Sequence, residues 1–198
     1  MSMGLPQTVA RFTPVEYYRL EHASETKSEF HHGEIFAMAG ASIEHSQICT
    51  NLIFEIQSRL KGTPCVPLGS DTRLKVESTG LRVYPDVGIY CGPIEIDPED
   101  PASQTATNPT VLFEVLSKST ESYDRGTKAQ NYRQIKSLRA HILLSQNEPR
   151  AEIYERGVDG GWLLREVSGL ESTLAIPSID VTIPLADLYA RVDFARAE

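Results

Sequence analysis

Two acidic residues stand inside apolar stretches of this sequence: Asp86 within residues 83–90 and Glu114 within residues 109–117. Both stretches are short and rich in β-branched and aromatic residues, which predicts two buried strands. A carboxylate is costly to desolvate unless a cation or a hydrogen-bond donor meets it. We therefore interpret Asp86 and Glu114 as ligands that share one cation.

Phosphate-ester chemistry follows from that pair of carboxylates. Hard cations such as Mg²⁺ or Mn²⁺ take oxygen ligands and keep several waters, so one or two protein carboxylates suffice when a substrate phosphate completes the shell. The cation also removes the repulsion between two neighbouring carboxylates. Such an ion lowers the pKa of a bound water and clamps a phosphodiester for in-line attack. Asp86 and Glu114 thus indicate a metal-dependent phosphodiester hydrolase.

Lys128 is the candidate for an amine that stabilises developing negative charge at such a site. It lies near the start of a predicted helix, one turn before Tyr132, so both side chains share a face. An ordinary surface ion pair with Asp124, four residues earlier, is the alternative interpretation of Lys128. Glu34 is either a further carboxylate for the metal or its water, or an exposed strand residue.

The histidine and cysteine residues indicate no metal site. His45 lies one turn before Cys49 on a predicted helix, where a lone histidine is typical of a packed or capping residue. Cys49, Cys65 and Cys91 are odd in number, widely spaced and not in a metal-binding pattern. We expect buried or inert thiols in a reducing cytoplasm, and no zinc.

The elements that must position these residues indicate an α/β fold, with a mixed β-sheet flanked by helices. Hydrophobic periodicity and turn residues predict helices over residues 13–20, 42–60, 119–136 and 184–189, and strands over residues 28–31, 34–38, 73–76, 81–90, 109–117, 140–144, 151–155 and 162–167. Within strand 109–117, side-chain alternation puts Glu114 on one face with Leu112 and Leu116. The strand–helix–strand unit around Glu114 favours a mixed sheet, and 198 residues suit one domain spanning residues 1–198.

Composition limits the possible partners. The net charge of -8 argues against a broadly cationic nucleic-acid-binding surface. Basic residues nevertheless gather between residues 118 and 139, either lining a cleft for a polyanion or forming a solvated helix face. No apolar run approaches the roughly 18 residues that a membrane span requires. Residues 1–6 lack the pattern of a secretory signal, so we expect a cytoplasmic protein without membrane contact.

Three short motifs carry a family resemblance. Tyr-Pro-Asp-Val at residues 84–87, Phe-Glu-Val-Leu-Ser at 113–117 and Tyr-Asp-Arg-Gly-Thr-Lys at 123–128 resemble the PD-(D/E)xK nuclease superfamily. More narrowly, the chain resembles the Uma family of bacterial restriction-endonuclease-like proteins, from about residue 13 to residue 188. The resemblance implies a restriction-endonuclease-like fold, a divalent metal and phosphodiester hydrolysis. By analogy, Asp86 and Glu114 would be metal ligands and Glu34 an auxiliary carboxylate.

The sequence departs from the superfamily pattern at Leu116, where a lysine is expected two residues after the acidic ligand. Lys128 is our candidate for the missing amine, with Lys118 as second choice. We interpret the protein as a Mg²⁺- or Mn²⁺-dependent DNA endonuclease that forms a homodimer, because two-fold symmetry suits cutting both strands. The rival interpretations are a decayed nuclease fold that binds nucleic acid or protein, and a hydrolase of another phosphate ester.

Overall fold

The structure is a computed structural model that describes residues 11–38 and 40–196, so the N-terminal stretch judged for a secretory signal lies outside it. Its larger sheet has the strand order β11-β10-β9-β8-β6-β3. The bounds are β3 (Cys65–Gly69), β6 (Val87–Cys91), β8 (Val111–Leu116), β9 (Ala140–Ser145), β10 (Arg150–Arg156) and β11 (Trp162–Ser168). Strands β8 and β9 are parallel and the other pairs are antiparallel, which confirms the expected mixed sheet.

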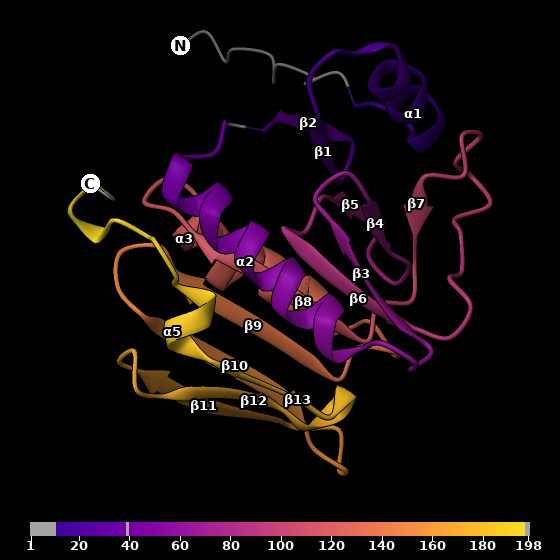
Figure 1. Cartoon of the computed structure of the whole chain (residues 1–198). Coiled ribbons are helices and arrows are strands. Elements are labelled where there is room, and N and C mark those ends of the chain that lie inside the picture. The colour runs from indigo at the N-terminus through magenta and orange to yellow at the C-terminus, as the bar shows by residue number, and fades with distance from the viewer. Residues whose placement is uncertain (1–10, 39, 197–198) are drawn as a thin grey trace, which may run out of the picture.

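A second sheet, in the order β2-β1-β5-β4-β7, lies beside the first (Figure 1). Its bounds are β1 (Ser28–His31), β2 (Glu34–Ala37), β4 (Arg73–Val76), β5 (Leu81–Val83) and β7 (Thr105–Ala106). A small pair consists of β12 (Thr173–Ile176) and β13 (Val181–Pro184). The hairpin predicted at His32-Gly33 is present, and both residues adopt positive φ there.

The helices are α1 (Pro14–Ala23), α2 (Ile43–Arg59), α3 (Glu121–Tyr123), α4 (Ala129–Tyr132) and α5 (Leu185–Leu188), with a π-helical turn at Asp124–Lys128 and 3₁₀ turns at Pro177–Ile179 and Phe194–Arg196. Thr13 and Glu16 form the predicted capping box of α1, and Ser42 caps α2. In the described part of the chain, no helix is both long and apolar enough to cross a lipid bilayer.

Helix α2 crosses one face of the larger sheet (Figure 1), and its apolar stripe of Ile48, Leu52 and Ile56 packs into the main core. The alternation predicted for β8 is confirmed. Its residues Val111, Phe113 and Val115 join that core, whereas Leu112 faces a second core built from β4, β5 and the chain after α4. Glu114, which shares the face of Leu112, therefore lies in the layer between the two sheets.

Three expectations about the elements are wrong. The strand expected over 81–90 is interrupted at residues 84–86, because β5 and β6 belong to different sheets and the chain crosses between them there. The helix expected over 119–136 is a succession of α3, the π-helical turn and α4, ending at Tyr132. Strands β3, β7, β12 and β13 were not predicted, since β3 and β7 lie in stretches rich in turn residues and β12 and β13 flank a Pro-Ser turn.

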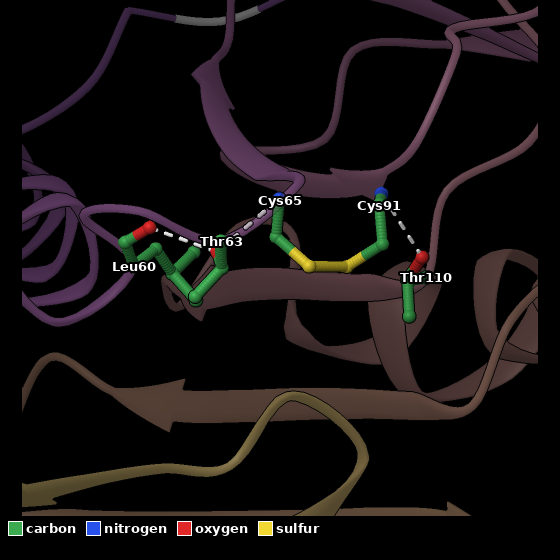
Figure 2. Close-up of a disulfide and its surroundings, with 5 residues drawn as sticks. All are labelled: Leu60, Thr63, Cys65, Cys91 and Thr110. Atoms are coloured by element: carbon green, nitrogen blue, oxygen red, sulfur yellow. Dashed lines mark hydrogen bonds between the residues drawn. A yellow bond between two sulfur atoms is a disulfide. The ribbon is translucent and has the colours of Figure 1, made fainter.

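The expectation of inert thiols fails for two of the cysteines. Cys65 and Cys91 face each other across β3 and β6 and form a disulfide (Figure 2). Thr63 links this end of β3 to α2, because its hydroxyl accepts from Cys65 N–H and donates to the Leu60 carbonyl (Figure 2). The spacing of the cysteines in the sequence could not predict this disulfide, because the disulfide depends on the register between β3 and β6. Cys49 remains a free thiol.

Candidate active site

Asp86 occupies the link between β5 and β6, at the point where the chain leaves one sheet for the other. Its Oδ2 accepts a hydrogen bond of 2.7 Å from the backbone N–H of Val115 and lies 3.2 Å from His45 Nε2. Both contacts use the same oxygen. Among the described residues Oδ1 has no hydrogen bond, and the side chain is 16% exposed, so this oxygen is available to a ligand.

Glu114 lies in the middle of β8 and is 2% exposed. Tyr132 donates a 2.6 Å hydrogen bond to its Oε1, and Lys128 Nζ donates one of 3.1 Å to its Oε2. Burial raises the pKa of Glu114 well above its usual range; Lys128 counteracts this in part, while the charges of Asp124 and Asp86 add to it. The carboxylate is thus incompletely neutralised by its protein neighbours.

Lys128 ends the π-helical turn and is 5% exposed, a burial that is rare for a lysine. Its Nζ lies 3.1 Å from Glu114, 3.4 Å from Asp124 and 3.5 Å from Glu29. Burial alone lowers the pKa of this ammonium, but the surrounding carboxylates, Glu114 first, outweigh that effect and raise it well above its usual value. The ion pair with Asp124 exists, yet it is buried within a larger cluster and is not an ordinary surface pair.

The cluster carries an excess of negative charge. The carboxylates of Glu29, Asp86, Glu114 and Asp124 all act on the ammonium of Lys128. One ammonium cannot neutralise four carboxylates, and buried like charges repel strongly in a medium of low dielectric constant. A divalent cation held by oxygen atoms of Asp86 and Glu114 fits this donor set and would relieve that repulsion. The residues present therefore fit Mg²⁺ or Mn²⁺.

His45 belongs to this region, although its sequence context favoured a packed or capping residue. The N-cap of α2 is Ser42, whose hydroxyl accepts from His45 N–H, while the His45 ring points to Asp86. Cys49, one turn later, places Sγ 3.6 Å from His45 Nδ1. Burial lowers the pKa of His45, but the hydrogen bond and charge of Asp86 outweigh it and the net shift is upward. Burial raises the pKa of the Cys49 thiol.

The structure brings Asp86, Glu114 and Lys128 together but leaves Glu34 outside the cluster. Glu34 is exposed on the edge strand β2, paired with His31. Glu29, two residues before His31 on β1, was not predicted as a site residue, yet its carboxylate contacts Lys128. Period-two alternation puts Glu29 and His31 on one face, a signal that was present in the sequence. The packing of the second sheet on the larger one decides which acidic residue of the β1–β2 hairpin lies close to Lys128.

Lys118, the second candidate for the amine, and Leu116, which stands where the superfamily pattern has a lysine, both lie in described parts of the structure. Lys118 is exposed beyond the end of β8, and no hydrogen bond or ion pair joins its side chain to the described residues. Leu116 is buried on the same face of β8 as Glu114. Its alkyl side chain therefore fills the place where the superfamily pattern has an amine, and the ammonium reaches Glu114 from the π-helical turn instead.

Neighbouring groups hold the two chain segments that carry the site. Tyr84, two residues before Asp86, donates 2.7 Å to Glu21 Oε1 and accepts 2.7 Å from Arg73 Nη2. Arg125, within the π-helical turn, makes a two-pronged pair with Glu152 on β10. Paired planar contacts of this kind fix orientation as well as charge. A π-helical turn at such a position is typical of functional sites.

The mixed sheet, with a carboxylate–lysine cluster beside its central strands, defines a protein of the restriction-endonuclease-like fold. The model of the Uma2 family, described as "Putative restriction endonuclease", matches residues 14–186. The chain belongs to the Uma2 family.

Two relatives and one solved structure extend this comparison. The chain is 32% identical over 185 residues to the uncharacterized protein slr1290 of Synechocystis sp., covering 93% of this chain and 94% of that protein. It is 34% identical over 169 residues to sll1609 of the same organism, covering 84% and 93%. A crystal structure from Anabaena variabilis, described as a "putative nuclease belonging to DUF820", shares the fold with a TM-score of 0.68 at 16% identity, covering 84% of this chain and 92% of that one.

Proposed function

We propose that this protein is a Mg²⁺- or Mn²⁺-dependent DNA endonuclease. It would hydrolyse phosphodiester bonds in an active site formed around Asp86 and Glu114. The single observation that carries the proposal is the charge excess around Glu114 in β8 and Asp86 just before β6. Four carboxylates act on one buried ammonium, and among the described residues one oxygen of Asp86 has no hydrogen-bond partner. A purely structural cluster would be expected to balance its charges and hydrogen bonds.

Each residue of the cluster has a distinct role in this proposal. Asp86 and Glu114 bind the divalent cation, which when present lowers the pKa of a water and neutralises charge on the phosphate. Val115 N–H and His45 hold Asp86 Oδ2, so the carboxylate keeps a fixed orientation. Lys128 offers an ammonium to the developing negative charge. Glu29 positions that ammonium. Glu34, exposed on β2, stays a candidate auxiliary carboxylate.

The test is metal-dependent nicking of supercoiled plasmid and cleavage of single-stranded DNA. We expect Asp86→Asn and Glu114→Gln to lose at least about a hundredfold in rate, because each removes a charge that acts on the reacting phosphate through the cation. Lys128→Ala should fall by a similar factor, with the exposed Lys118→Ala as its matched control. Wild type and Glu114→Gln nicking at the same rate would reject the proposal.

The rival function, a decayed fold that only binds, is supported by Leu116 in the expected lysine position. It predicts retention of DNA in a mobility-shift assay with no cleavage in either Mg²⁺ or Mn²⁺. Cleavage of a small phosphate diester but not of DNA would instead indicate another phosphate-ester substrate.

Assembly and location are also part of the proposal. We propose a homodimer, because a single active site per chain cuts both strands most simply with two-fold symmetry. Light scattering across a wide concentration range tests it, and one chain mass throughout would contradict it. We propose a cytoplasmic location; since disulfides are rare in that compartment, the state of Cys65 and Cys91 in rapidly alkylated cells bears on it. Fully oxidised cysteines in cells would argue for an oxidising compartment.

A further inference from the structure

Three side chains of different chemistry meet at the N-terminal end of α2, on the α2 side of the carboxylate cluster. They are His45, Cys49 and Asp86, and one donor atom from each lies within 4.8 Å of the others. His45 and Cys49 are four residues apart on one helix, so their side chains share a face. Asp86 comes from the link between β5 and β6. All three are partly exposed, so a small solute has access.

We propose that His45, Cys49 and Asp86 bind a divalent transition-metal ion of the Zn²⁺ or Co²⁺ class. This goes beyond the nuclease function: Asp86 is the shared ligand, His45 only orients Asp86 in the nuclease site, and Cys49 has no role there. It also reverses the expectation from cysteine spacing, which considered pairs of cysteines and gave no reason to expect zinc. Helix geometry supplies the spacing here, as it does when two residues at i and i+4 bind one metal ion.

The distances suit an ion. Ligands about 2.1 Å from a tetrahedral ion lie roughly 3.4 Å from one another. His45 Nε2 and Asp86 Oδ2 are already 3.2 Å apart. Cys49 Sγ lies beside the same ring, 3.6 Å from Nδ1, and one donor atom from each of the three residues lies within 4.8 Å of the other two. Three protein ligands with one position open to solvent is the usual arrangement of a zinc site that binds an exchangeable ligand.

The electrostatic environment favours a cation. Asp86 and Asp124 act on a charge at His45, where the ammonium of Lys128 opposes them, and Asp86 and Glu114 act on a charge at Cys49. The positive end of the α2 dipole opposes a cation near its first turn, but it amounts to only about half an elementary charge. The nearby carboxylates exceed that. The local field therefore attracts a divalent ion from solution.

The donor set selects the kind of ion. A thiolate and an imidazole suit Zn²⁺ and Co²⁺, whereas Mg²⁺ prefers oxygen and retains its water. The oxygen-rich cluster of Asp86 and Glu114 and the mixed set of His45, Cys49 and Asp86 thus differ in preference. Asp86 has two oxygens and faces both sets, with Oδ2 on the His45 side.

Co²⁺ titration of the full chain tests the proposal by absorption spectroscopy. A thiolate bound to Co²⁺ gives a charge-transfer band in the near ultraviolet. Because Cys65 and Cys91 are bonded to each other, Cys49 is the only thiol that can produce this band. We expect the band to appear at about one equivalent, to persist in excess Mg²⁺ and to disappear when Zn²⁺ is added.

Variants assign the band to the three ligands. Cys49→Ser should abolish it, and His45→Gln and Asp86→Asn should each weaken Co²⁺ binding at least about tenfold. His32→Gln, which changes an exposed histidine of the β1–β2 turn, is the matched control and should leave binding unchanged. Circular dichroism verifies that each variant is folded.

The results that overturn the proposal are specific. Absence of the band in the folded wild type would leave Cys49, His45 and Asp86 as a hydrogen-bonded chain without an ion. A band that survives His45→Gln and Asp86→Asn unchanged would indicate adventitious binding to the thiol alone. Glu114→Gln separates the two proposals: it should stop DNA cleavage and keep the band, because Glu114 is not among these ligands.

Discussion

Buried charge is concentrated in two regions of this protein, and they differ in balance. Beneath α1, Arg82 Nη2 pairs with Glu99 at 2.7 Å and lies 3.5 Å from Asp97. Lys75 pairs with the same two carboxylates at 2.6 and 2.8 Å. Arg73 extends this network to Asp100 at 3.3 Å. Cations and anions there are nearly equal in number, and each guanidinium also contacts a tyrosine hydroxyl.

The cluster at Lys128 has the opposite character, since several carboxylates contact one ammonium. A balanced network contributes structure because each charge is met within the protein. An unbalanced cluster keeps an excess of negative charge, which a bound cation can neutralise. We therefore expect mutations in the region beneath α1 to change the stability of the fold, whereas the Lys128 cluster should respond to cations and to substrate.

The largest stability effect is expected in the balanced network. Arg82→Met should lower the free energy of unfolding by about 3–5 kcal/mol, because it leaves Asp97 buried without one of its partners. Urea denaturation measures this, with Arg19→Met on the exposed side of α1 as the matched control. A loss no greater than that of the control would show that Arg82 is not structural, and the comparison would fail.

Lys128→Met breaks the comparison from the other side. We expect a cost of about 3 kcal/mol in the absence of divalent ions, because the carboxylates lose their only buried ammonium. An exposed pair with Asp124 alone would have cost at most about 1 kcal/mol. Mn²⁺ should restore much of the lost stability. Failure of Mn²⁺ to do so, while Lys118→Met behaves as wild type, would contradict a cation site at this cluster.

Divalent cations should stabilise the folded wild type by binding at Asp86 and Glu114. At about a hundred times the dissociation constant, Mg²⁺ or Mn²⁺ should add about 2.7 kcal/mol to the free energy of unfolding. Asp86→Asn should remove most of this gain, whereas Asp71→Asn, an exposed aspartate paired with Lys27, should not. Equal stabilisation of both variants would place the cation elsewhere. Thermal denaturation in chelated and metal-loaded buffer measures the difference.

An effect that is small per pH unit concerns His141, a buried neutral group beside Tyr132 whose two ring nitrogens have no hydrogen-bond partner among the described residues. Burial lowers the pKa of His141 from 6.5 to about 3, with the charge of Lys128 contributing. Between those values only the unfolded chain takes up the proton, so acidification below pH 6.5 destabilises the fold by up to about 1.4 kcal/mol per pH unit.

His141→Phe should remove that part of the pH dependence and leave the protein at least as stable at pH 7, because an unpaired buried polar group is replaced by an apolar ring. Urea denaturation between pH 4 and pH 7 provides the measurement, with His32→Phe as the exposed control. Parallel pH profiles for wild type and His141→Phe would contradict the assigned cause.

Several local elements and the two central carboxylates could be predicted from the sequence alone. The capping box at Thr13, the apolar stripe of α2 and the alternation along β8 are set by neighbours in the chain, and all three are present. Asp86 and Glu114 were identifiable because charge in an apolar strand demands a partner. Lys128 followed from helical spacing to Tyr132, and both now contact Glu114.

Only the tertiary structure decided which other groups meet that pair. Glu29 reaches Lys128, and Glu34 does not, because the packing of one sheet on the other selects which end of the hairpin lies inward. His45 and Cys49 approach Asp86 because the chain crosses between sheets at residue 86, next to the start of α2. Contacts between segments forty residues apart depend on register and layer packing, and no local periodicity encodes those.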